Sequence, residues 1–242
     1  MPAHTLQSRT DHEVMWWQRR DMIKAAAAWV ALGGAPAALA QQRSNVVQLT
    51  GRALLNGRSL LAGQSIQTGD EIRTGPGSLL VFTLGTAAFL VRQNTLLTVE
   101  RGNTLNTVSV LRLLSGAVAS VWGKGSNRTV LTPTLTAGIR GTGVTGIYTE
   151  VRPLEDRRTY FCNCYGAVEL SAGRQKQVSQ SDYHQSFWAE ANAATGSLIR
   201  PAAYIDHTDE ELEFLAGLIQ ERTHWQIAGR KGKGDGSGTL GY

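Results

Sequence analysis

The sequence lacks the short motifs that carry most enzyme chemistry. It contains no G-x-S-x-G nucleophile elbow, no H-E-x-x-H metalloprotease helix, no phosphate-binding loop and no dinucleotide-binding fingerprint. The segment Gly138–Gly143 is rich in glycine, but it lacks the lysine and the following helix of a phosphate-binding loop. These absences argue against an enzyme.

The chain also lacks a basic stripe and a long apolar run. Its 24 Lys and Arg against 19 Asp and Glu give a net charge of +5 that is spread along the sequence. The basic tail residues Arg230, Lys231 and Lys233 are too few to change this picture, so no nucleic-acid partner is expected. Beyond the N-terminus no segment is apolar enough to span a membrane.

Glycine is frequent and proline is scarce, with 27 and 6 residues, and the glycines follow no collagen-like period. This pattern is typical of many tight turns. Short β-rich runs recur between turn signals. They cover Val46–Leu49, Arg52–Leu55, Glu71–Arg73, Ser78–Thr83, Ala87–Arg92, Leu96–Glu100, Ser109–Leu114, Ala117–Val121, Arg128–Leu131, Gly138–Tyr148, Thr159–Tyr165, Ala167–Leu170 and Arg174–Val178. The sequence therefore predicts an all-β fold, either a β-sandwich or a β-solenoid of many short strands.

One helix is expected, near the C-terminus, over Thr208–Ala228. Thr208 and Glu211 form a capping box, and Asp209 and Glu210 favour the positive end of the helix dipole. Apolar residues at helical spacing predict a face that packs on the sheet. His224, late in this helix, is placed to cap its negative end.

The N-terminus has the pattern of an export signal. Residues 16–24, WWQRRDMIK, resemble the twin-arginine consensus, with Arg19 and Arg20 as the pair. An alanine-rich stretch follows and ends in an A-x-A cleavage site at Ala38 and Ala40. The alternative, a membrane anchor, is disfavoured by the length of the stretch and by its glycines and proline. The mature protein is expected in the periplasm, and the twin-arginine route implies export after folding, often with a bound cofactor.

Four regions follow from these signals. They are an export signal at 1–40, an all-β domain at 41–180, a C-terminal extension with the helix at 181–229, and a flexible tail at 230–242.

From Val46 to Leu170 the sequence resembles the periplasmic domain of the FecR family. The segment Gly63–Thr74, GQSIQTGDEIRT, contains the family's G-D-x-I-x-T element at Gly69, Asp70 and Thr74. A later segment, TPTLTAGIRGTGV, resembles its most specific motif, in which T-P is followed after a short spacer by I-R-G-T. Its residues here are Thr132, Pro133, Arg140, Gly141 and Thr142. The resemblance implies a binding and signalling module of FecR-like all-β fold, with a periplasmic or envelope protein as partner. Only the expected export signal precedes the β-rich region, so the family's cytoplasmic anti-sigma region and spanning helix are not expected here and anti-sigma activity is not carried over.

Arg140 lies in what is predicted to be an apolar strand. An arginine in that setting needs acceptors, so it is expected to pair with carbonyls or a carboxylate and to fix the fold rather than to bind a ligand.

The two cysteines form a Cys-x-Cys pair, Cys162 and Cys164, in a predicted strand. Residues two apart share one face of a strand, so both sulfurs point the same way. This geometry is poor for a disulfide and good for chelating a soft metal. His184 and His207 are positioned in the sequence to complete a tetrahedral site for zinc, iron or copper, with Asp182 as an outer support for His184. A disulfide and two reduced core thiols remain open alternatives.

Three functions are therefore open. The first is a non-enzymatic, periplasmic binding and signalling module, and the second is a metal-binding sensor or carrier centred on the cysteine pair. The third is a glycan-binding envelope protein, which depends on aromatic residues such as Trp122 and Trp188 and is equally explained by packing.

Overall fold

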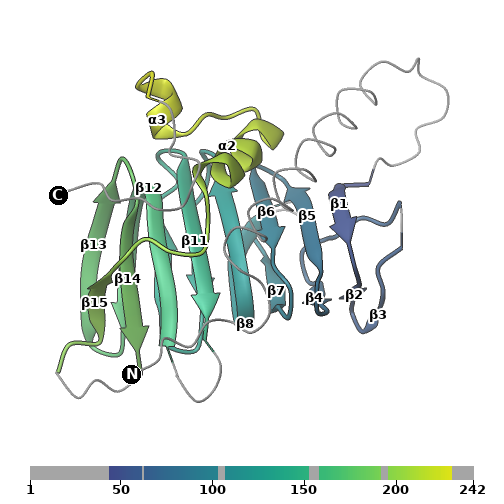
Figure 1. Ribbon diagram of the computed structural model, residues 1–242, viewed down its shortest axis with the longest axis horizontal. Helices are drawn as coiled ribbons and strands as arrows, with labels where there is room; N and C mark the ends of the chain where they lie inside the picture. The colour runs from purple at the N-terminus through teal and green to yellow at the C-terminus, as the bar shows by residue number, and fades with distance from the viewer. Residues whose placement is uncertain (1–43, 62, 103–106, 153–157, 192–195, 231–242) are drawn as a thin grey trace. The chain divides into compact units, whose positions relative to one another are not determined.

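The computed structural model describes residues 44–61, 63–102, 107–152, 158–191 and 196–230 (Figure 1). The expected export signal, with Arg19, Arg20, Ala38 and Ala40, lies outside the described residues, as does the expected tail beyond residue 230. The described chain is mostly strand, which confirms the all-β class. Among these residues, no helix has the length and apolar character needed to cross a membrane.

The strands form two sheets that share two long strands, β8 (Val108–Trp122) and β12 (Arg158–Ala172). Sheet A has the order β1 (Val46–Thr50), β5 (Leu79–Leu84), β6 (Ala87–Val91), β8, β11 (Thr145–Val151), β12, β14 (Gln185–Glu190) and β15 (Ile199–Ala202). Sheet B has the order β3 (Arg58–Ser59), β2 (Ala53–Leu55), β4 (Glu71–Thr74), β7 (Leu96–Arg101), β8, β9 (Arg128–Leu131), β10 (Thr136–Ile139), β12 and β13 (Gln175–Ser181). Neighbouring strands are antiparallel except β8 and β9, which are parallel. Of the two predicted architectures, the structure has the sandwich and not the solenoid.

Each shared strand changes sheet at a glycine with positive φ. In β8 this residue is Gly116, with φ of 77°, and in β12 it is Gly166, with φ of 103°. A left-handed residue kinks a strand and lets it turn from one sheet into the next, and glycine adopts it without steric cost. The two pairs of short strands predicted on either side of these glycines are therefore two continuous strands.

Sheet A is buried on both faces, which explains the nearly unbroken apolar runs of its central strands. Val118, Ile147 and Phe161 belong to the core cluster between the sheets. Successive residues of a strand point to opposite faces, so their neighbours Ala119, Tyr148 and Cys162 lie on the outer face. These three are register partners across β8, β11 and β12 and form one row.

Two short helices cover part of that outer face, where one long helix was predicted (Figure 1). α2 (Asp209–Leu218) begins at the predicted capping box of Thr208 and packs on β6 and β8. It ends because Gln220 takes a left-handed conformation, with φ of 60°. A second capping box, formed by Thr223 and Gln226, then starts α3 (His224–Ile227).

A strand crosses the expected boundary at residue 180. β13 runs through it to Ser181, and β14 and β15 continue sheet A beyond it. The predicted C-terminal extension is therefore part of the sandwich, together with the segment that bears the helices.

Candidate metal centre

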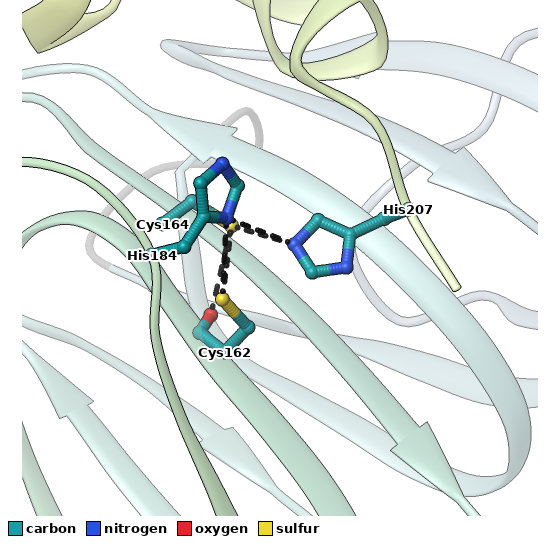
Figure 2. Close-up of side chains that lie close together, drawn as sticks. All are labelled: Cys162, Cys164, His184 and His207. Carbon is teal, nitrogen blue, oxygen red and sulfur yellow. Dashed lines mark hydrogen bonds between the residues drawn. The ribbon is translucent and has the colours of Figure 1, made fainter. Parts of the chain in front are cut away.

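The structure brings the four predicted ligands together on the outer face of sheet A (Figure 2). Cys162 and Cys164 project from the same face of β12, as their spacing predicts. His184 lies in the turn between β13 and β14, and His207 directly precedes the N-cap of α2. All four side chains are buried, and their ligand atoms lie within 4.8 Å of one another.

The distances between these atoms are close to the edges of a metal-centred tetrahedron. Sγ of Cys162 and Sγ of Cys164 are 3.7 Å apart, and Nδ1 of His184 and Nε2 of His207 are 3.2 Å apart. Each sulfur is near one nitrogen, at 3.4 Å for Cys162 and His184 and 3.3 Å for Cys164 and His207. With Zn–S of about 2.3 Å and Zn–N of about 2.0 Å, ideal edges are about 3.8 Å between sulfurs and about 3.3 Å between nitrogens. Four of the six edges therefore match one tetrahedral ion, and the two remaining sulfur–nitrogen pairs lie within 4.8 Å.

Hydrogen bonds orient both imidazoles for this role. Nε2 of His184 lies 2.7 Å from Oδ1 of Asp209, and Nδ1 of His207 lies 2.7 Å from the backbone oxygen of Ile205. Each of these nitrogens donates its proton to an oxygen, so in the neutral imidazole the opposite nitrogen, which faces the cluster, has the lone pair that could bind a metal. Tyr183 donates to Oδ2 of Asp209 at 2.8 Å and holds that carboxylate in turn.

The two cysteines are not joined in a disulfide, and their surroundings shift the pKa values of the two thiols in opposite directions. Burial raises the pKa of the Cys162 thiol, but a hydrogen bond from Cys164 and the nearby His207 and His184 outweigh it, so this pKa lies well below its usual range. Burial and the neighbouring Cys162 raise the pKa of Cys164 well above its usual range. Burial lowers the pKa of His184, but Cys162 and Asp209 outweigh it and raise that pKa to about 9. Ionised sulfur is the form that binds metal.

Aromatic rings enclose the cluster. Tyr148 stacks on His207 with ring centroids 4.6 Å apart, and Trp225 of α3 stacks on His184 at 5.5 Å. The ring of Tyr204 lies 4.1 Å from that of His184 and 4.5 Å from that of His207. This shell keeps water away from the four ligand atoms and lowers the local dielectric.

Ion pairs hold the segment that carries His207. Nη2 of Arg92, at the end of β6, donates to the backbone oxygen of Asp206 at 2.9 Å and to Oε2 of Glu211 at 3.0 Å. Nη2 of Arg152 lies 3.1 Å from Oδ2 of Asp206. The segment is therefore fixed to sheet A on both sides of the histidine.

Two predicted roles near the cluster are wrong. Asp182 does not support His184, because its Oδ1 lies 3.2 Å from Nδ1 of His224 instead. His224 does not cap the negative end of a long helix, because it is the first residue of α3. The residue that supports His184 is Asp209, which the sequence pattern indicates only as part of the helix start. Its position two residues after His207 is the feature of the sequence that could have indicated this role.

The first group of family-motif residues has structural roles in turns and sheet contacts. Gly69 takes a φ of 102° in the turn before β4. Asp70 accepts from the side chain of Asn56 and from the backbone of Gln67, both at 2.7 Å. Thr74 is buried, and its hydroxyl donates to the backbone oxygen of Arg92.

The second group shapes the turns at either end of β10. Thr132 and Pro133 lie in the turn from β9 to β10, where the buried Thr132 hydroxyl accepts from the backbone of Leu135 at 2.9 Å. Gly141 leaves no room for a side chain, because a Cβ there would lie 1.7 Å from the backbone oxygen of Gly125. Thr142 follows in the same turn.

Arg140 pairs with a carboxylate, as expected, but not inside a strand. It follows the last residue of β10, is exposed, and forms a salt bridge with Glu169 of β12. The arginine lowers the pKa of the exposed Glu169. This contact ties neighbouring strands of sheet B at the surface.

The aromatic residues named for glycan binding do not form an exposed platform. Trp122 is fully buried in the core cluster. Trp188 is partly buried, and the guanidinium groups of Arg158 and Arg152 lie over its ring, 4.6 and 5.5 Å from the centroid. Packing and cation–π contacts account for both.

No protein-family model matches the sequence, and no curated protein matches it significantly. Two crystal structures of a "putative anti-sigma factor" from Parabacteroides distasonis are similar in part. One has 15% identity and a TM-score of 0.42 over 55% of this chain and 58% of that one. The other has 14% identity and a TM-score of 0.43 over 57% of this chain and 60% of that one. The chain thus spans less than two thirds of their length, and at this level of similarity the function must be argued from the site itself.

Proposed function

We propose that this chain is an exported, non-enzymatic binding module built around a closed metal centre of two cysteines and two histidines. The observation that carries the proposal is the convergence of Cys162, Cys164, His184 and His207 within 4.8 Å. Two thiolates and two imidazoles in a tetrahedron are a donor set typical of Zn²⁺, and iron is the next choice. A single ion is favoured over a cluster because every ligand atom is close to the other three.

The arrangement supports a structural or sensing role for the metal. Four protein ligands fill a tetrahedral ion, so no position is left for a catalytic water or a substrate. All four ligands are also buried, which would make rapid transfer of the ion to another protein difficult. A carrier is therefore the less favoured of the metal-binding functions.

The export and partner parts of the proposal rest on the sequence. The twin-arginine pattern at Arg19 and Arg20 supports export of an already folded chain, which would allow the metal to be inserted in the cytoplasm. The FecR-like motif segments support a periplasmic signalling role with an envelope protein as partner.

Elemental analysis of protein exported by its own signal, with a free-thiol count, tests the metal centre. We expect about one metal ion per chain, lost in the Cys162→Ser/Cys164→Ser double variant. His224→Gln is the matched control, because His224 lies in the same segment but outside the four-residue cluster. Protein with neither metal nor free thiols would have a disulfide, and the proposal would be wrong.

A further inference from the structure

The four ligands come from three separate parts of the chain. The cysteines belong to β12, His184 to the turn after β13, and His207 to the segment that leads into α2. We define the cover as residues 203–230, which include α2 and α3. We infer that the metal is a latch that holds the cover on the outer face of sheet A, so that metal binding controls exposure of that face. This inference rests on the proposed metal centre.

The face beneath the cover is apolar. Leu90 of β6 and Val121 of β8 are fully buried, yet they are not members of the core cluster between the sheets. They alternate along their strands with residues of that cluster, so they lie on the outer face. α2 packs on β6 and β8 there, and its residues Leu212, Leu215 and Ala216 are buried. Removing the cover would expose this face to water.

The cover has little stability of its own. α2 has 10 residues and α3 has 4, and isolated helices shorter than about 12–15 residues are marginal in water. Its buried ion pairs are at one end, where Arg92 meets Glu211 and His184 meets Asp209, and α3 adds an exposed contact between His224 and Asp182. Buried ion pairs contribute little net stability because desolvation offsets their attraction.

A metal ion would strengthen the attachment of the cover near His207. The nitrogens of His184 and His207 that face the cluster are 3.2 Å apart. Without an ion, the cluster depends mainly on hydrogen bonds between these imidazoles and the cysteine sulfurs, at 3.4 and 3.3 Å, and sulfur is a weak hydrogen-bonding partner. An ion replaces these weak contacts with four metal–ligand bonds, one of them to the residue next to the N-cap of α2.

The rest of the sandwich does not need the latch. Its core cluster lies between the sheets and includes Phe82, Phe89 and Val118. The four ligands are not part of that cluster. Loss of metal should therefore release the cover and leave the two sheets folded.

Hydrogen–deuterium exchange of the full chain, with metal content measured on the same samples, tests the latch. Three states are compared: protein loaded with Zn²⁺, protein treated with a chelator, and treated protein after Zn²⁺ is restored. We expect amides in 209–228 to exchange about tenfold faster or more without metal and to recover with Zn²⁺, while β5, β6 and β8 keep their protection. The His184→Gln variant should resemble the chelated state, and His224→Gln should resemble the loaded one.

The outcomes separate the latch from the metal centre. If no Zn²⁺ binds, the proposed function fails and the latch fails with it. If about one Zn²⁺ binds but exchange in 209–228 is the same in all three states, the centre is real and the latch is wrong. If protection is lost throughout both sheets, the ion supports the whole fold, and the latch is also overturned.

Discussion

Asp209 links the metal centre to the helix that covers it. As the first residue of α2 it places a negative charge at the positive end of the helix dipole. Its carboxylate also orients His184 and accepts from Tyr183. One side chain thus serves the helix start and the ligand, and these two roles can be separated by measurement.

The Asp209→Asn substitution should weaken metal binding. The amide is a poorer acceptor for the proton on Nε2 of His184, so the ligand is less basic and less firmly oriented. Loss of such an outer partner typically costs about 10–100-fold in metal affinity. Competition with a chromophoric chelator measures the change, and Asp182→Asn is the control because Asp182 pairs with His224. Equal affinities for wild type and Asp209→Asn would show that Asp209 serves only the helix.

The residue types and spacing were enough to predict that the four side chains could converge, but not which carboxylate supports His184. Cys-x-Cys in a strand fixes both sulfurs on one face, which depends only on local geometry. Whether Asp182 or Asp209 supports His184 depends on where α2 packs on the sheet. Closeness in the sequence predicts Asp182, which is not the residue that His184 contacts. Asp182 is two residues from His184, but it pairs with His224 of α3.

At the level of elements, the glycines that divide β8 and β12 determine the architecture. The sequence pattern predicts a separate strand on each side of each glycine, because a glycine in a strand pattern commonly marks the end of the strand. In the structure each glycine is a corner at which one strand leaves sheet B for sheet A, or the reverse. Local patterns locate the corner, but only pairing over the whole chain shows that the strand continues.

The Gly116→Ala substitution should destabilise the fold strongly. A Cβ there would lie 2.3 Å from Oγ1 and 2.5 Å from Cα of Thr95, and φ is 77°. We expect a loss of about 3 kcal/mol, from about 1–2 kcal/mol for the left-handed backbone and the rest from overpacking. Urea unfolding measures it. Gly57→Ala is the matched control, because Gly57 has the same φ of 77° but no atom within 4 Å of a built Cβ. If the two variants lost the same free energy of unfolding, the left-handed backbone alone would account for the need for glycine at position 116.

At the scale of the whole molecule, the sequence indicates the all-β class. It does not indicate that the central strands of sheet A are buried on both faces. Apolar runs such as β5 and β6 look like strands of an ordinary core. The second buried face of sheet A depends on α2, which packs on β6 and β8. The covered face and the ligands lie in the same layer, so metal binding should stabilise the native state with the cover in place relative to the unfolded chain.

This coupling predicts that unfolding depends on free zinc. An ion that binds only the native state stabilises it by RT ln(1 + [Zn²⁺]/Kd), so each tenfold rise in free zinc above Kd should add about 1.4 kcal/mol to the free energy of unfolding. Urea titrations in zinc buffers measure this slope. The Cys162→Ser/Cys164→Ser variant should show a slope near zero, and His224→Gln should keep the wild-type slope. Affinity of the unfolded chain for zinc would reduce the slope, but a wild-type slope equal to that of the double variant would mean that the four residues do not bind zinc in the folded protein.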